Sequence, residues 1–323
     1  MTAMTPSSNP MALHTLPDTL CYLNGEFTAL KDAKISVMDR GFIFGDGVYE
    51  VLPVYGGQVF RAAQHMARLA RNLTELRIDN PHTATQWLAI AAKLIAAHAH
   101  STRADGSFDC EDAGHAGDQL IYIQVTRGVA LRDHVMTQGL TPTVFVMVSA
   151  MTIPSAQQRT QGVACVTADD FRWEKAHIKS TSLLGAVFAR QISFEAGAVE
   201  TVMFRDGYLS EAAASNVWVV KNGAVLGPPK DHLVLEGIRY GLIEGLCHDA
   251  GIGFELRRIS RAEVSSADEL LLSSATKEVL AITRLDGVPV GNTSTRGLPG
   301  PIYAQLFDGY QRAKQTGSTG VTT

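Results

Sequence analysis

Short glycine-containing turns recur along this chain, and they constrain its fold more than any other feature. Asn24-Gly25, Asp206-Gly207 and Asp286-Gly287 each stand between two apolar runs, and Gly56-Gly57 and Asn222-Gly223 follow the same pattern. A two-residue hairpin turn needs positive φ at its central positions, which asparagine, aspartate and glycine adopt at the lowest cost. The sequence therefore predicts a succession of antiparallel hairpins.

Helical spacing of apolar residues accompanies these hairpins. Met66, Leu69, Leu73 and Leu76 predict a helix over 62–77. The glycines of GFIFGDG precede a strand and have the wrong spacing for a dinucleotide fingerprint. Helices and hairpins without a regular βαβ rhythm predict a mixed α/β (α+β) fold rather than a doubly wound sheet. Further helices are expected over 83–99, 182–198, 238–250 and 300–313.

The length of the chain and its breaks in pattern predict two domains. With 323 residues, 46% of them hydrophobic, it exceeds one average domain. MTIPSAQQRT interrupts the strand pattern at 151–160 and predicts an interdomain linker, while the polar stretch 101–117 predicts a surface loop. The expected division is a disordered extension at 1–17, an N-terminal α/β domain at 18–150, a C-terminal domain at 161–313 and a disordered tail at 314–323.

Composition excludes several classes of protein. The net charge is −4 and the 28 lysines and arginines form no basic run, so nucleic acid is not an expected partner. No apolar stretch approaches the roughly 20 residues of a membrane helix, and the N-terminus has no signal-peptide pattern. The four cysteines are widely spaced, which argues against a metal site or a disulfide framework and predicts a cytoplasmic protein.

Several residues could carry chemistry, although their types alone do not establish it. Lys179 in HIKST stands between an expected strand and a helix, where a partly buried amine could form a Schiff base. Most lysines are exposed, so Lys179 taken alone favours a solvated side chain. Glu211, Arg68 and the basic residues of ALRDHVM, taken singly, equally favour structural or solvated roles.

Four segments taken together and in order change this interpretation. DRGFIFGDGVYEV, YIQVTRG, RWEKAHIKSTSLLGAV and SEAAASNVW resemble the class IV, fold-type IV, pyridoxal phosphate (PLP)-dependent aminotransferases, and above all the bacterial D-amino acid aminotransferases. The resemblance extends from about Leu20 to about Tyr310. It implies a smaller N-terminal α/β domain and a larger, β-barrel-like C-terminal domain, with the cofactor at their interface.

The resemblance assigns cofactor roles to matching positions. It implies that Lys179 carries PLP as a Schiff base and moves the proton, and that Glu211 keeps the pyridine nitrogen protonated. Arg68 would hold the phosphate, together with the start of the helix at LEGIRYG. Arg239 replaces a threonine common in the family, and would either bind the phosphate or point to solvent. The other implied cofactor residues are Ser215, Asn216, Leu235, Gly237, Ile238, Ser274 and Thr276, and alanines stand at 212–214 and 275 where the family often has hydroxyls.

The resemblance also assigns a trap for the substrate carboxylate. Tyr49, Arg132 and His134 would bind the α-carboxylate, with Tyr122 nearby on its strand. In the family the arginine–histidine loop crosses a dimer interface. The chain is therefore expected to be a homodimer in which Arg132 and His134 serve the neighbouring active site.

The expected reaction is transamination between a D-amino acid, such as D-alanine, and a 2-oxo acid, such as 2-oxoglutarate. Three other activities of the same fold stay open: a branched-chain L-amino acid aminotransferase, an (R)-selective amine transaminase and an aminodeoxychorismate lyase. A homologue that binds PLP without catalysis is a further alternative, although Lys179, Glu211 and Arg68 are all present.

Overall fold

The computed structural model describes residues 16–104, 117–291 and 296–315. Most of the expected extension, tail and 101–117 loop lies outside these residues. Two of the expected boundaries are wrong within them. Helix α3 (Ala84–Ala104) continues into the expected loop, and α8 (Pro301–Gln315) includes Lys314, whose buried amine lies 2.7 Å from Glu278. The expected linker contains the short helix α4 (Ala156–Gln161), which begins with a capping box formed by Ser155 and Gln158.

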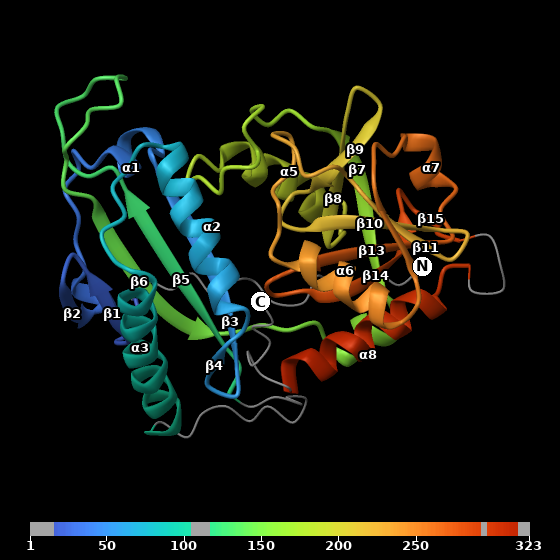
Figure 1. Ribbon diagram of the computed structural model, residues 1–323, viewed down its shortest axis with the longest axis horizontal. Coiled ribbons are helices and arrows are strands. Elements are labelled where there is room, and N and C mark those ends of the chain that lie inside the picture. The colour runs from blue at the N-terminus through green and yellow to red at the C-terminus, as the bar shows by residue number, and fades with distance from the viewer. Residues whose placement is uncertain (1–15, 105–116, 292–295, 316–323) are drawn as a thin grey trace.

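The first sheet is antiparallel and has the strand order β2-β1-β6-β5-β3-β4. Helices α2 (Ala62–Glu75) and α3 lie beside it (Figure 1), and Leu69, Leu73 and Leu94 are buried in the core that they share with the sheet. A 3-10 helix (Leu30–Asp32) and α1 (Arg40–Phe44) connect its early strands. The strands are β1 (Leu20–Leu23), β2 (Glu26–Ala29), β3 (Gly47–Tyr55), β4 (Gln58–Val59), β5 (Gln119–Thr126) and β6 (Thr143–Ala150).

The second sheet is mixed and curled. Its order is β12-β11-β10-β13-β14-β7-β8-β9, with β15 paired to β14. Strand β9 lies at one end of this order, but a tight turn joins it directly to β10, and Ala212 N–H donates to the Ser215 carbonyl in this turn. The sheet must therefore curl so that β9 comes close to β10. The strands are β7 (Val163–Asp169), β8 (Glu200–Arg205), β9 (Tyr208–Ala212), β10 (Asn216–Lys221), β11 (Ala224–Gly227), β12 (Gly253–Leu256), β13 (Glu269–Ser274), β14 (Glu278–Leu285) and β15 (Val288–Pro289).

The predicted hairpins are present. Asn24, Asp206, Asn222 and Asp286 all have positive φ, as does the glycine that follows each of them. Helices α5 (Leu184–Glu195), α6 (Arg239–Asp249) and α8 pack around the second sheet (Figure 1), with α7 (Arg261–Ser265) nearer its edge. The predicted mixed α/β fold is thus confirmed, while the division into domains at 151–160 stays a prediction.

The segment around Lys179 joins the two sheets. Tyr49 N–H donates to the Lys179 carbonyl at 3.0 Å, and Thr181 N–H donates to the Gly47 carbonyl at 2.9 Å. These bonds attach the segment to β3 of the first sheet, and α5 then continues to β8 of the second. Among the residues that the structure describes, no helix is long and apolar enough to cross a membrane.

Candidate active site

A cavity of about 940 Å³ lies where residues of β3 and α2 face residues of the second sheet. Side chains from segments far apart in the sequence line it, and most of the residues expected at the site are among them. These are Tyr49, Arg68, Lys179, Glu211, Ser215, Asn216, Leu235, Gly237, Ile238, Arg239, Ser274 and Thr276.

Three expected substrate residues lie outside the cavity of their own chain. The Tyr122 ring stacks on that of Tyr49 with 5.8 Å between centroids. Arg132 and His134 lie in an exposed loop, against the ring of Phe44 at 5.5 Å and 5.2 Å. Arg132 and His134 are therefore available to a second molecule, and their service to a neighbouring site stays a prediction.

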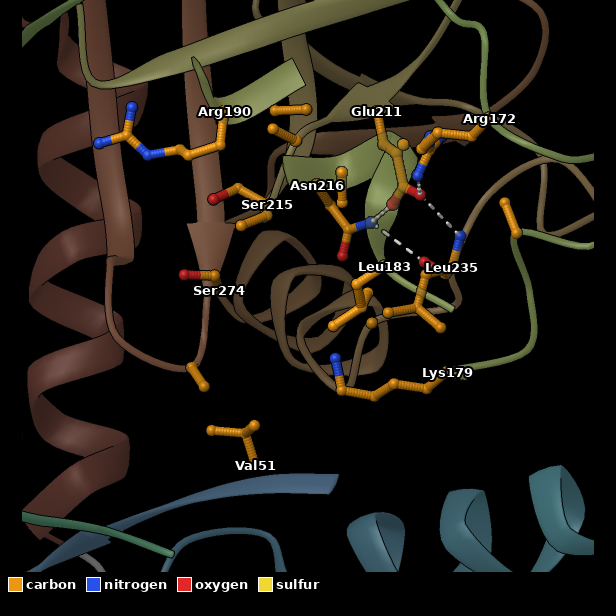
Figure 2. A pocket seen from close by; sticks show the side chains of 18 of the residues that line it. Val51, Arg172, Lys179, Leu183, Arg190, Glu211, Ser215, Asn216, Leu235 and Ser274 are labelled. Carbon is orange, nitrogen blue, oxygen red and sulfur yellow. Dashed lines mark hydrogen bonds and ion pairs between the residues drawn. The ribbon is translucent and has the colours of Figure 1, made fainter. Parts of the chain in front are cut away.

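The amine of Lys179 reaches into the cavity (Figure 2). Its Nζ lies 4.1 Å from the centroid of the Tyr49 ring. Among the residues that the structure describes, no carboxylate forms an ion pair with this amine. Because the two backbone bonds to β3 fix its main chain, Lys179 can present an amine that is not neutralised by a neighbouring acid.

Glu211 is held in place by a network of charged side chains centred on Arg172. Arg172 Nη1 donates to Glu211 Oε1 at 2.5 Å, and two other nitrogens of Arg172 donate to Asp170 at 2.9 Å and 2.8 Å. Burial raises the pKa of Glu211 above its usual value, and Arg172 opposes this effect. Arg172 therefore positions the carboxylate. The one signal for it in the sequence is its place in the RWEKAHIK segment, seven residues before Lys179.

Asn216 fixes the loop that faces Glu211 (Figure 2). Its Nδ2 donates to Glu211 Oε2 at 3.1 Å and to the Leu235 carbonyl at 3.0 Å, while Leu235 N–H donates to Glu211 Oε1 at 3.3 Å. A Cβ atom at Gly237 would collide with Asn216 Oδ1. Glycine is required at 237 because the backbone passes so close to this amide.

Arg68 is paired inside the protein with a residue that the sequence did not mark. Its guanidinium donates to Glu50 at 2.6 Å and 2.9 Å and to the Glu236 carbonyl at 3.1 Å. His65 Nδ1 lies 3.0 Å from the same carboxylate. Burial would raise the pKa of Glu50, but the charges of Arg68 and His65 outweigh it and hold that pKa below its usual value.

The buried His65 makes the stability of this fold sensitive to acid. Burial lowers its pKa from 6.5 to about 4, so neutral His65 stabilises the fold above pH 6.5, and this contribution is lost as the pH falls towards 4. The unfolding free energy of the wild type should fall between about pH 7.5 and about pH 4.5. We expect this fall to be about 2–3 kcal/mol smaller in His65→Gln. Urea unfolding at both pH values measures it. Exposed His248 supplies the control variant His248→Gln, and an unchanged pH dependence in His65→Gln would contradict the assignment.

Arg239 does not point to solvent, which corrects one of its two expected orientations. Its side chain is buried and its Nη2 donates to the Tyr310 hydroxyl at 3.0 Å. Its backbone begins α6, and the N-cap residue Ile238 supplies no side-chain hydrogen bond to the first turn. The amides at this helix start are thus available to an anion.

The remaining polar residues of the cavity lie at the turn between β13 and β14 and at the turn between β9 and β10. Ser274 Oγ accepts from Lys277 N–H at 3.1 Å. Ser215 Oγ and Lys277 Nζ both contact the buried carboxylate of Glu200, at 2.8 Å and 2.9 Å. These bonds hold Ser215 and the 274–277 turn against each other at one side of the cavity.

Comparisons with known proteins show to which family the chain belongs. Residues 47–285 match the family model described as amino-transferase class IV. The chain is 34% identical over 290 residues to a D-alanine aminotransferase of Bacillus licheniformis, covering 90% of this chain and 95% of that one. A D-alanine aminotransferase of Staphylococcus aureus is 32% identical over 292 residues, covering 90% and 96%.

Solved structures show the same fold. A branched-chain aminotransferase of Thermoproteus uzoniensis superposes with a TM-score of 0.79 at 22% identity, covering 93% of this chain and 96% of that one. A branched-chain amino acid aminotransferase of T.th., solved with pyridoxamine 5'-phosphate, also gives 0.79, at 20% identity and 94% and 96% coverage. The architecture is that of fold-type IV enzymes. The chain belongs to the class IV aminotransferases, whose cofactor is PLP.

The residues present fit this cofactor. The cavity presents the Lys179 amine on one side and the fixed Glu211 carboxylate on another (Figure 2). Buried polar atoms without a hydrogen-bond partner in the described structure include His65 Nε2 and Arg239 Nε. The start of the helix at Gly237–Arg239 gives one end of the cavity a positive potential, as a phosphate requires, and Arg68 lines the same cavity. Among the described residues, no group of three His, Cys, Asp or Glu could hold a metal ion.

Proposed function

We propose that this protein transfers an amino group between a D-amino acid, such as D-alanine, and a 2-oxo acid, such as 2-oxoglutarate. The observation that carries the proposal is the Lys179 amine in the cavity, 4.1 Å from the Tyr49 ring and opposite the fixed Glu211. The relatives named D-alanine aminotransferases, at 32–34% identity, support the choice of a D-amino acid.

Lys179 would hold PLP through a Schiff base and, once released by substrate, would move the proton. When bound, PLP supplies the electron sink for the charge that develops at the substrate Cα. A single amine held on β3 can both accept and return that proton, because its backbone is fixed by the 3.0 Å bond to Tyr49.

Glu211 would face the pyridine nitrogen and keep a proton on it. The ion pair with Arg172 and the bond from Asn216 hold this carboxylate in place. Leu235, whose carbonyl accepts from Asn216, would pack on the ring. A fixed carboxylate is suited to this role because it needs no reorganisation when charge develops.

The phosphate would lie at the positive end of the cavity. Arg68 and the amides of Gly237, Ile238 and Arg239 would bind it, with the hydroxyls of Ser274 and Thr276. Ser215, held against Glu200 at 2.8 Å, would position the neighbouring turn.

Tyr49, with Tyr122 stacked on it, would bind the α-carboxylate together with Arg132 and His134 of a second copy of the chain. Exposed apolar side chains on α5 and in the basic loop support this homodimer. On α5, Leu184, Phe188 and Phe194 are 69%, 59% and 66% exposed, and in the basic loop Leu131 is 87% exposed. Apolar side chains gathered in this way usually mark an interface. The described cysteines are all free, which supports the proposal of a cytoplasmic protein.

An assay that compares several amino donors tests the proposed substrate class. D-alanine, L-alanine, L-leucine and (R)-1-phenylethylamine are each offered with 2-oxoglutarate, and formation of the new amino acid is measured. We expect strong turnover of D-alanine alone. Preference for L-leucine or for the amine would reject the proposed carboxylate-binding residues, and the assignment to the family would be unaffected. Pyruvate release from aminodeoxychorismate without an acceptor would identify a lyase.

A further inference from the structure

Two arginines of the cofactor region, the buried Arg239 and the half-buried Arg61, form no ion pair with an acidic residue in the described part of the chain. Arg239 is 3% exposed; its Nη2 contacts Tyr310 Oη at 3.0 Å, and its Cζ lies 5.7 Å from the centroid of the Phe60 ring. Arg61, at the start of α2, lies against the first turn of α6, with its Nη2 3.5 Å from where a Cβ of Gly241 would stand. The Nε atoms of both arginines lack a hydrogen-bond partner among the described residues.

The two guanidinium groups share one electrostatic neighbourhood. Burial, and next the positive charge of Arg239, lower the pKa of Arg61. The first turn of α6 adds to the positive potential, because it contains no acidic residue and has no side-chain cap. Two groups of like charge and a helix N-terminus thus lie together, with Arg239 buried and Arg61 half-buried.

The carboxylates that act on this region are already neutralised. Glu50 acts on Arg239 but is paired with Arg68 and bonded to His65. Glu278 acts on Tyr55, beside Tyr310, but is paired with Arg159 and Lys314. Burial lowers the pKa of Arg239, but Tyr310, Tyr55 and Glu50 together raise it. Within the described part of the chain, neither Arg61 nor Arg239 is paired with a carboxylate of its own.

Uncompensated buried charge strongly disfavours folding unless an anion completes the region. The phosphate of PLP carries close to two negative charges at neutral pH. The two unpaired guanidinium groups lie beside the proposed phosphate site, since Arg239 lines the cavity and Arg68 contacts the neighbouring Glu236 carbonyl.

We propose that Arg61 and Arg239 are positioning residues that supply the counter-charge for the cofactor phosphate from behind its cradle. Their charges act on the phosphate through the low-dielectric interior. The Arg239 side chain does not replace the hydroxyl of the threonine that is common in the family at this position, because its guanidinium is hydrogen-bonded to Tyr310. This inference rests on the proposed phosphate end of the cavity. It explains why an arginine can occupy the first position of α6, where a cation is otherwise unfavourable.

The test compares PLP with pyridoxal, which lacks the phosphate. Apoenzyme of the wild type, Arg239→Met, Arg61→Met and the exposed-arginine control Arg284→Met is titrated with each compound by absorbance. We expect Arg239→Met and Arg61→Met to weaken PLP binding by about 10- to 100-fold, the scale of a charge-assisted interaction. Pyridoxal affinity should change by less than about twofold in every variant. Equal losses for PLP and pyridoxal, or no loss for either, would overturn the inference.

Thermal unfolding separates this role from a structural one. Because neither cation is paired with a carboxylate in the apoenzyme, Arg239→Met and Arg61→Met should leave the apo melting temperature unchanged or higher. Both variants should also reduce the increase in melting temperature on adding inorganic phosphate. A parallel fall of the apo and PLP-bound melting temperatures would instead assign the arginines to packing. The binding results do not depend on which amino donor is used. Normal PLP binding in both variants would overturn only this inference, whereas a wild type that binds no PLP would overturn the proposed function as well.

Discussion

Lys179→Ala is expected to lower transamination by at least about two orders of magnitude, the range in which a positioned acid–base group contributes. The amine is removed while the residues that fix its backbone and the Glu211 network stay in place. Turnover of D-alanine is measured together with the absorbance of the bound cofactor. The covalent linkage should be lost from the spectrum.

The control for this variant is Lys175→Ala. Lys175 is an exposed lysine of the same segment, four residues before Lys179. It should keep both turnover and spectrum. Near-normal turnover in Lys179→Ala would reject the assignment of this lysine.

Arg132→Ala is expected to raise the KM for D-alanine about tenfold to hundredfold, because one charge-assisted contact is worth roughly 1.5–3 kcal/mol. The absorbance of bound PLP should not change, since the proposed role of Arg132 is to bind the substrate carboxylate and not the cofactor. Steady-state kinetics measure the effect. Gln138→Ala, in the same exposed loop, is the control, and unchanged kinetics in Arg132→Ala would show that the trap is misplaced.

Mixing the two variants tests whether Arg132 serves the other subunit. A heterodimer of Lys179→Ala and Arg132→Ala would contain one site with Lys179 from one chain and Arg132 from the other. Random exchange of subunits in a twofold dimer should therefore restore about a quarter of wild-type activity. If Arg132 acted within its own chain, no site would be intact and mixing would restore nothing.

Local sequence determined the elements of this fold well. The Asx-Gly pairs form hairpins because positive φ is a property of two adjacent residues, and all four have it. The spacing of Met66, Leu69 and Leu73 likewise predicted α2 from local sequence, since one face of a helix is encoded within a few turns. The ends of α3 and α8 lie beyond the positions that the sequence predicts, because fraying and tertiary contacts such as Lys314 with Glu278 decide where a helix ends.

The candidate site was predictable where a motif carries the chemistry. The segments around Lys179 and Glu211 are specific enough to mark both residues, and both line the cavity. Glu50 and Arg172 could not be found in the same way. Their importance comes from partners 18 and 39 positions away in the chain, Arg68 and Glu211.

The sequence by itself thus determined the hairpins and most of the helices, and it marked Lys179, which lies in the cavity. Only the tertiary structure decided that Arg68 is already paired with Glu50, that Arg172 holds Glu211, and that Arg239 turns inward to Tyr310. Turns and helical faces depend on neighbouring residues, whereas burial and charge pairing depend on which distant segments exclude water together.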